Sequence, residues 1–147
     1  MRHVAICAAE YFGHVLGRPA PDPTPDVGLD PHADFVTPAE QSLAEALGQV
    51  DRWWAHADAT IAALPLDAPG RVPWWEGARG EVTLRRLLVH MVAEVHRHAG
   101  HADVLRETLD RRAGLRPDAT NLPDGFDWVA HVERVDRVAR EAAARHG

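Results

Sequence analysis

The stretch VTLRRLLVHMVAEVHRHAGHADVLRETLD, residues 82–110, decides the fold. Its apolar residues return every three or four positions, which is the spacing of one face of an α-helix. They are Leu84, Leu87, Leu88, Met91, Val95, Ala102, Leu105 and Leu109. Thr83 is suited to cap the start of this helix and Gly114 to stop it, so we predict a helix from about Thr83 to Arg112.

Proline-bearing loops separate this helix from three other segments with helical periodicity. The predicted segments cover about residues 2–16, 37–64 and 125–145. The second has the clearest start, because Thr37 can be the N-cap, Pro38 the first helical residue and Glu40 the end of a capping box. Its predicted core-facing stripe is Leu43, Leu47, Val50, Trp54, Ala57, Ile61 and Leu64.

No strand shows convincing alternation of apolar and polar residues. The sequence therefore predicts an all-α, up-and-down bundle of about four main helices. A length of 147 residues suits one domain with one core. We expect a single helical domain over residues 1–147, with a proline-rich loop at 17–36 and a C-terminal helix at about 125–145.

Charge and composition exclude several classes of protein. A net charge of −6 argues against general nucleic-acid binding, which requires a basic face. No apolar run approaches the roughly 20 residues that span a bilayer. The lone Cys7 excludes an internal disulfide framework and fits a reducing compartment, so we expect a cytoplasmic protein.

Four polar residues lie beside the apolar face of the helix at 84–112. His90, Glu94, His98 and His101 fall within an arc of about 80° at the helical increment of about 100° per residue, whereas His96 falls on the outer surface. Glu94 and His98 are one turn apart, so their side chains can converge on one metal ion. A hydrogen-bonded pair of buried side chains is the alternative explanation, and a metal site would need a third ligand from another segment.

The first helix supplies candidates for that ligand. His3, Cys7 and His14 lie at the border of its apolar side, which Val4 and Val15 mark. Cys7 is better explained as a small core residue than as a ligand. Periodicity does not choose between His3 and His14.

Two adjacent tryptophans, Trp74 and Trp75, lie in the loop RVPWWEGARGEV at residues 71–82. They cannot both face one core. Either they cover the end of the bundle, or they form a wall of a binding cleft. Arg85 and Arg86 follow, and they are either exposed helix charges or contacts for an anionic group.

The segment at 82–110 resembles the last core helix of the DinB/YfiT-like metalloprotein superfamily. It is most similar to the branch, described in actinobacteria, that includes mycothiol-dependent maleylpyruvate isomerase and the mini-circle proteins. The register "LRRLLVHM", then Glu94, then "HAGHAD" carries this likeness. RHVAICAAEYFGHVLG at 2–17 resembles the metal-bearing second helix of that family, and ADFVTPAEQS at 33–42 resembles the start of its third.

The resemblance implies a divalent metal held by one histidine of the second helix and by two side chains of the fourth. The matching positions are His3, Glu94 and His98, with zinc expected first and nickel, iron or manganese as alternatives. His90, His101, Trp74 and Trp75 become candidates for supporting the ligands or contacting a substrate. Gly100 is then interpreted as a close-packing point beside the site.

The family has a full helix before the one that carries the first ligand, whereas this sequence begins two residues before His3. We expect either a start farther upstream or a protein that works without that helix, with an apolar groove filled by the final segment or by a second subunit. The implied function is a transferase or isomerase that uses mycothiol or a similar thiol on a small electrophile. The alternative is a non-catalytic metal- or ligand-binding bundle that forms a homodimer through the groove.

Overall fold

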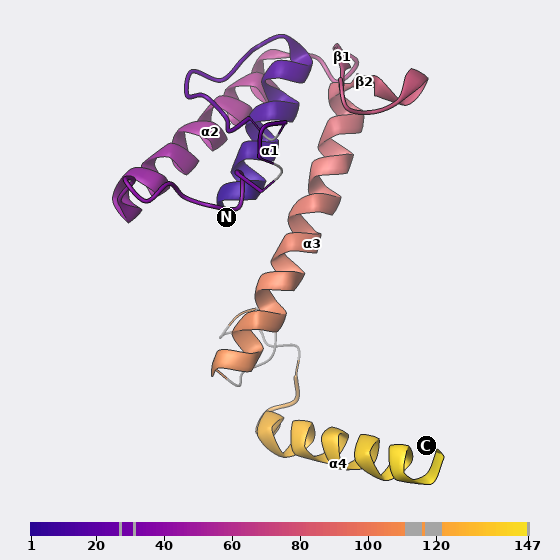
Figure 1. The fold of residues 1–147 in the computed structure, drawn as a ribbon. Helices are drawn as coiled ribbons and strands as arrows, with labels where there is room; N and C mark the ends of the chain where they lie inside the picture. The colour runs from indigo at the N-terminus through magenta and orange to yellow at the C-terminus, as the bar shows by residue number, and fades with distance from the viewer. Residues whose placement is uncertain (27, 31, 111–115, 117–121, 147) are drawn as a thin grey trace. The chain divides into compact units, whose positions relative to one another are not determined.

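The computed structural model describes residues 1–26, 28–30, 32–110, 116 and 122–146 (Figure 1). Within these ranges the chain is predominantly helical, which confirms the predicted all-α class. The elements are α1 (Arg2–Phe12), a 3-10 turn η1 (His14–Leu16), α2 (Leu43–Ala63), β1 (Pro69–Arg71), a 3-10 turn η2 (Gly77–Gly80), β2 (Glu81–Thr83), α3 (Leu84–Asp110) and α4 (Trp128–His146).

The chain divides into two compact units, Met1–His98 and Ala99–Gly147, which we describe separately. The first unit holds α1, α2, the short hairpin and the greater part of α3. The prediction of a single domain over the whole chain stays a prediction. No helix of the described ranges is both long and apolar enough to cross a membrane.

Helix α1 is shorter than the predicted segment 2–16. It ends at Phe12 because Gly13 leaves helical geometry with φ −104° and ψ −92°, and a separate 3-10 turn follows. Gly17 closes that turn in the left-handed conformation, with φ 68°, and donates its N–H to the carbonyl of His14. Gly17 therefore ends the 3-10 turn, whereas the α-helix itself stops four residues before the predicted end at residue 16.

Helix α2 begins five residues later than the capping box at Thr37 predicts. Residues 38–41 form a turn in which the N–H of Gln41 binds the carbonyl of Pro38 at 3.0 Å. Ser42 is the N-cap, and it exchanges hydrogen bonds with Glu45 of 3.3 Å and 2.8 Å. This capping box satisfies two backbone N–H groups at once, so the helix starts here and not at the box that Thr37 and Glu40 could form. Its end at Ala63 matches the prediction.

A two-stranded antiparallel hairpin replaces the predicted loop between α2 and α3. Strand β1 pairs with β2 in the register Pro69↔Thr83, Gly70↔Val82 and Arg71↔Glu81. The prediction that the chain has no strand was wrong because three-residue strands are too short to show alternation. The hairpin connection holds Trp74 and Trp75 next to the start of α3.

Thr83 precedes α3 as predicted, and its hydroxyl accepts a long 3.4 Å hydrogen bond from the N–H of Arg86. The predicted end of the helix, at Arg112 and Gly114, lies outside the described residues. Helix α4 begins at Trp128 rather than at about 125. The carboxylate of Asp127 accepts a 2.9 Å hydrogen bond from the N–H of Ala130, as an N-cap does.

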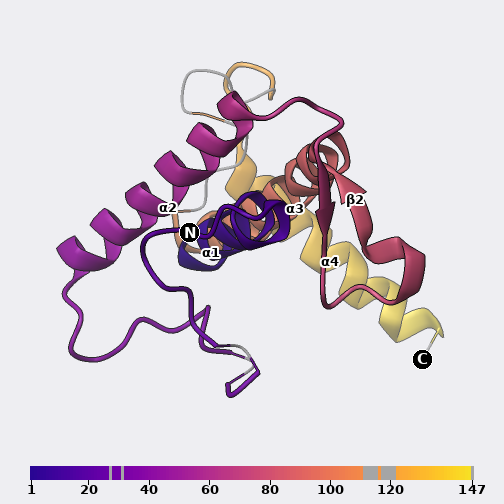
Figure 2. The same ribbon diagram turned by 90° about the horizontal axis from the view of Figure 1, so that it is seen from above.

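The core of the first unit consists of two clusters that share α1. One joins α1 and η1 to α2, to the hairpin and to the start of α3; its buried members are Ala8, Tyr11, Phe12, Val15, Ala57, Ala68, Val72, Val82, Leu84, Leu87 and Met91. The other joins α1 to α2 through Ala5, Ile6, Ala9, Val50 and Trp53. Helix α1 lies beside α2 in both ribbon views (Figures 1 and 2).

The predicted apolar stripes are correct only in part. On α2 the buried residues are Val50, Trp53, Ala57 and Thr60, whereas Leu43 is 76 % exposed and Leu47 46 % exposed. On α3 burial ends at Met91, and both Leu105 and Leu109 are exposed. The four valines of α4 from Val129 to Val138 stay between 37 and 56 % exposed. Burial follows the extent of each unit rather than the full length of a periodic pattern.

Gly100 gives a test of how α3 is packed. A glycine inside a helix costs about 0.5–1 kcal/mol relative to alanine. A Cβ at Gly100 would meet no atom within 4 Å in the described part of the chain, so the interpretation of Gly100 as a close-packing point was wrong. We expect Gly100→Ala to raise the free energy of unfolding by about 0.5–1 kcal/mol in urea denaturation followed by circular dichroism.

Gly70→Ala serves as the comparison variant, and we expect the opposite effect on stability. A Cβ there would lie 2.7 Å from the carbonyl oxygen of Val15 and 2.9 Å from a methyl group of Leu16, so this change should lower the free energy of unfolding. A loss of stability in Gly100→Ala would contradict the open surroundings of that position.

Candidate functional site

Two helices of the first unit face each other with polar side chains spaced one turn apart. The facing stripe consists of His3, Cys7 and Tyr11 on α1 and of His90, Glu94 and His98 on α3. At one end the ring centroids of His3 and His98 are 4.7 Å apart. At the other end those of Tyr11 and His90 are 4.9 Å apart. The two helices therefore run antiparallel here, and residues at i and i+4 on each come together on one face.

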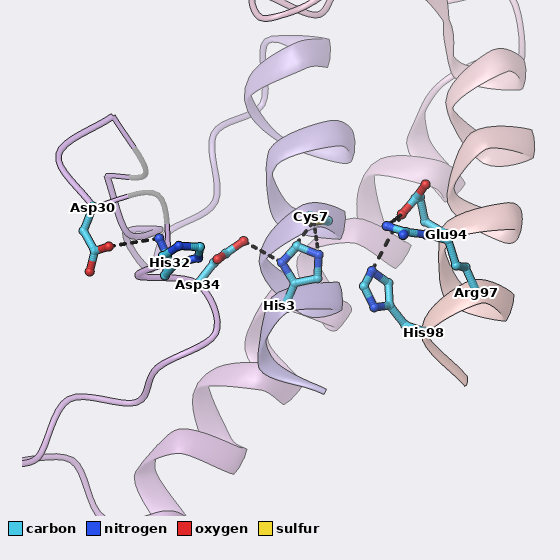
Figure 3. A network of polar contacts seen from close by, with 8 residues as sticks. All are labelled: His3, Cys7, Asp30, His32, Asp34, Glu94, Arg97 and His98. Atoms are coloured by element: carbon cyan, nitrogen blue, oxygen red, sulfur yellow. Dashed lines mark hydrogen bonds and ion pairs between the residues drawn. The ribbon is translucent and has the colours of Figure 1, made fainter. Parts of the chain in front are cut away.

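His3 is held from two directions by the loop that precedes α2. Its Nδ1 lies 2.5 Å from Oδ2 of Asp34, a residue that is only 8 % exposed. The ring of Phe35 stacks on the imidazole with centroids 4.2 Å apart and an interplanar angle of 14°. Cys7 approaches from a third side, with Sγ 3.7 Å from Nε2 of His3 (Figure 3). His3 is thus fixed in position although it stands at the start of a helix.

Glu94 lies between a histidine and an arginine of its own helix. Its Oε2 is 3.7 Å from Nε2 of His98 and 3.1 Å from the guanidinium of Arg97 (Figure 3). Partial burial alone would raise the pKa of Glu94, but the hydrogen bond and charge of Arg97 and the charges of His90 and His98 outweigh it, so its pKa lies below its usual range. Glu94 is therefore an anionic oxygen donor at neutral pH.

The Tyr11 end of the stripe is aromatic. The hydroxyl of Tyr11 lies 3.2 Å from Nε2 of His90, and the Tyr11 ring contacts Trp74 and Trp75 at centroid distances of 5.5 and 5.9 Å. His90 meets Trp75 edge to face at 5.0 Å. Burial raises the pKa of Tyr11, so its hydroxyl stays protonated at neutral pH.

A hollow of about 500 Å³ lies against this aromatic group. Its lining consists of Trp74, Trp75, Glu76, Arg79 and Arg86. The guanidinium of Arg86 sits 5.2 Å from the centre of the Trp75 ring, in a cation–π contact. Flat apolar walls next to arginine side chains suit a small ligand with a planar or an anionic part.

The structure brings most of the predicted site residues together in two groups. His3, Glu94 and His98 lie at one end of the facing stripe, and His90, Trp74 and Trp75 lie at the other. His14 is exposed and pairs with Glu10 at 3.0 Å, so His3 is the histidine of this segment that faces α3. His101, the remaining candidate, is exposed and belongs to the second unit.

Sequence reasoning missed Asp34, Phe35 and Tyr11 as members of the site. Tyr11 falls one turn after Cys7 on the same face of α1, and this spacing is the signal that could have indicated it. Asp34 and Phe35 belong to an irregular loop, where no periodicity predicts which side chains contact a helix. The only available signal is general, because a buried imidazole needs a hydrogen-bond partner.

The donors at the His3 end fit a divalent cation by their chemistry. Two imidazoles and one carboxylate are a ligand set that zinc accepts. In the described residues no three His, Cys, Asp or Glu side chains are arranged around a common point as they stand, and Glu94 turns toward Arg97. That ion pair is partly exposed, and such pairs contribute only about 0–1 kcal/mol, so Glu94 can turn to the histidines at small cost.

The sequence model described as Mycothiol-S-transferase matches residues 1–111, a range that contains both helices of the facing stripe. No curated protein and no solved structure matches the chain closely enough to add to this result. With three quarters of its length matched, the chain belongs to the mycothiol-S-transferase family, within the DinB-like superfamily.

Proposed function

We propose that this protein is a metal-dependent mycothiol S-transferase that joins the thiol to a small electrophile. One observation carries the proposal: His3 of α1 lies against His98 of α3, with Glu94 one turn away, within the range that the family matches. His3, Glu94 and His98 would hold the cation, with zinc first among the candidates. Nickel, iron and manganese remain alternatives.

The nucleophile in this proposal is the thiol of the substrate. A divalent ion held by His3, Glu94 and His98 would supply positive charge that lowers the pKa of the thiol. The thiol proton passes to solvent, the sulfur forms a bond to the electrophilic carbon, and the leaving group departs with the electron pair of the broken bond.

Cys7 is unsuited to be that nucleophile. Burial raises the pKa of the Cys7 thiol to about 11, and the negative charges of Asp34, Glu94 and Glu10 add to the shift. A thiol with this pKa is protonated at neutral pH, and the thiolate is the reactive form. Cys7 therefore serves as a neutral wall of the site.

The electrophile is proposed to bind in the hollow beside Trp74 and Trp75. Trp75, which lines this hollow, contacts the rings of Tyr11 and His90, and these two residues lie one turn along the stripe from Cys7 and Glu94. The aromatic walls exclude water from a bound planar group, and Arg79 and Arg86 favour an anionic substituent. The Tyr11 hydroxyl is protonated at neutral pH and lies 3.2 Å from Nε2 of His90.

Two expectations from the sequence are kept as parts of the proposal. A cytoplasmic location agrees with the lone cysteine, because structural disulfides are rare in that reducing compartment. A homodimer is the other expectation, and sedimentation or elution volume measures it directly.

The metal content of the purified protein tests the proposed metal centre. Protein purified without added metal should carry about one equivalent of a divalent ion, measured by inductively coupled plasma mass spectrometry. Substitution of a residue that only supports a metal ligand typically lowers the metal affinity by roughly 10–100-fold. Glu94→Ala and His98→Ala each remove a ligand, so they should lower the affinity by more than that. His96→Ala is the matched control, because His96 is exposed and binds only the carbonyl of Val92 in the described structure. Equally low metal in wild type and variants would show that the metal centre is wrong.

Thiol transfer is the second prediction. With mycothiol and a small aryl halide as substrates, the wild type should accelerate formation of the conjugate. His98→Ala should reduce that rate by at least roughly 10²-fold, because this is the loss that a misplaced reactant causes. Cysteine in place of mycothiol separates recognition of the whole thiol from simple thiol reactivity. A metal-loaded protein that accelerates no conjugation across a panel of electrophiles would favour the alternative of a non-catalytic binder.

The pH dependence of Cys7 alkylation is the third prediction. In chelator-treated protein the rate with iodoacetamide should rise about tenfold per pH unit through pH 9 and level off only near pH 11, because the buried thiol ionises late. Unfolded protein should level off near the ordinary thiol pKa of about 8.5. Mass spectrometry follows both reactions. A folded protein that titrates like the unfolded chain would contradict the burial of Cys7.

A further inference from the structure

The histidine at the start of α1 has a carboxylate at one of its two ring nitrogens. Nδ1 of His3 is 2.5 Å from the carboxylate of Asp34. An ionised carboxylate has no proton to donate, so the proton in this hydrogen bond belongs to Nδ1. In a neutral imidazole the other nitrogen, Nε2, then carries the lone pair.

The direction of that lone pair suits the proposed metal centre. Nε2 is the His3 nitrogen closer to Cys7, at 3.7 Å against 3.9 Å for Nδ1. Asp34 approaches the ring from a side different from that of Cys7, so the acceptor and the facing stripe do not compete for one nitrogen (Figure 3). The stacked ring of Phe35 restricts rotation of the imidazole, which keeps Nε2 in this orientation.

The cost of burying Asp34 argues for a role beyond packing. Oδ2 is used by His3, but Oδ1 is buried and meets no hydrogen-bond partner among the residues that the structure describes. A buried polar group without a partner lowers the stability of the folded protein. An aspartate that served stability alone would be expected to satisfy both oxygens.

We propose that Asp34 is a positioning residue that holds His3 as the Nδ1–H tautomer and thereby presents Nε2 to the metal ion. The inference deepens the proposed function and rests on His3 being a ligand there. A carboxylate behind a metal-bound imidazole fixes both the tautomer and the orientation of the ring, and it raises the basicity of the ligand. The loop at 32–36 therefore belongs to the metal site although it supplies no ligand.

Nitrogen-15 NMR of the metal-free protein reads the tautomer directly. At about pH 8, His3 of the wild type should be protonated at Nδ1 and unprotonated at Nε2. Asp34→Ala should lose this preference, and Asp34→Glu should restore it at least in part. A wild-type ring protonated at Nε2, alone or together with Nδ1, would overturn the proposal.

Metal affinity is the second readout. Competition with a chromogenic chelator should show Zn²⁺ bound about 10–100-fold more weakly by Asp34→Ala than by the wild type, with partial recovery in Asp34→Glu. Asp30→Ala is the matched control, because Asp30 is an exposed aspartate of the same loop whose carboxylate accepts a hydrogen bond from the backbone N–H of His32. Equal affinity in Asp34→Ala and wild type would overturn the positioning role.

The two readouts keep the inference separate from the proposed function. If the wild type binds no metal, the metal centre fails, and the NMR result still decides whether Asp34 sets the tautomer of His3. If the wild type binds metal and Asp34→Ala changes neither tautomer nor affinity, the metal centre stands and the role of Asp34 fails. A circular dichroism spectrum of each variant verifies that it is folded.

Discussion

The burial of α1 on several sides is the constraint on which the first unit depends. Helix α1 has only 11 residues, yet it contributes to both core clusters. Alanines at positions 5, 8 and 9 let neighbouring elements approach closely, while Ile6 and Phe12 fill the space between them. His3 and Cys7 lie on the side of α1 that faces α3, and Cys7 also packs against the first cluster, so packing decides which polar side chains meet α3.

The site therefore depends on the helical geometry of α1 and α3 and on the conformation of the loop before α2. Helical spacing aligns His3 with Cys7 and Glu94 with His98, and antiparallel packing sets the two pairs opposite each other. Regular structure does not position the acceptor behind His3. That acceptor comes from the loop before α2, which also stacks Phe35 on the imidazole.

The fold and much of the site follow from the sequence because helical periodicity is a local signal. It predicted the helical class, the position of α3 and the shared face of Glu94 and His98, and it put His96 on the outer surface. It failed where two local signals compete. Thr37 and Ser42 both begin a plausible capping box, and the turn at residues 38–41 decides for Ser42.

Periodicity also failed where burial depends on distant parts of the chain. Leu105 and Leu109 continue the apolar spacing of α3, but they lie beyond the first unit and stay exposed. Asp34 carries no local signal at all, since its burial depends on the contact of a loop with a helix 31 positions earlier in the sequence. Periodicity also did not choose between His3 and His14, because both stand at the border of the same apolar face; the family resemblance indicated His3, and His3 is the one that lies against His98.

A crystal structure with anomalous diffraction recorded at the metal absorption edge tests the central claim most directly. The account predicts one anomalous peak between α1 and α3, about 2.0–2.2 Å from a nitrogen of His3, a nitrogen of His98 and an oxygen of Glu94. The His3 nitrogen should be Nε2, with Asp34 still bound to Nδ1. An anomalous peak at other histidines would contradict the account. So would metal-supplemented crystals that show no ion between α1 and α3, with the side chains of His3 and Glu94 turned away from each other.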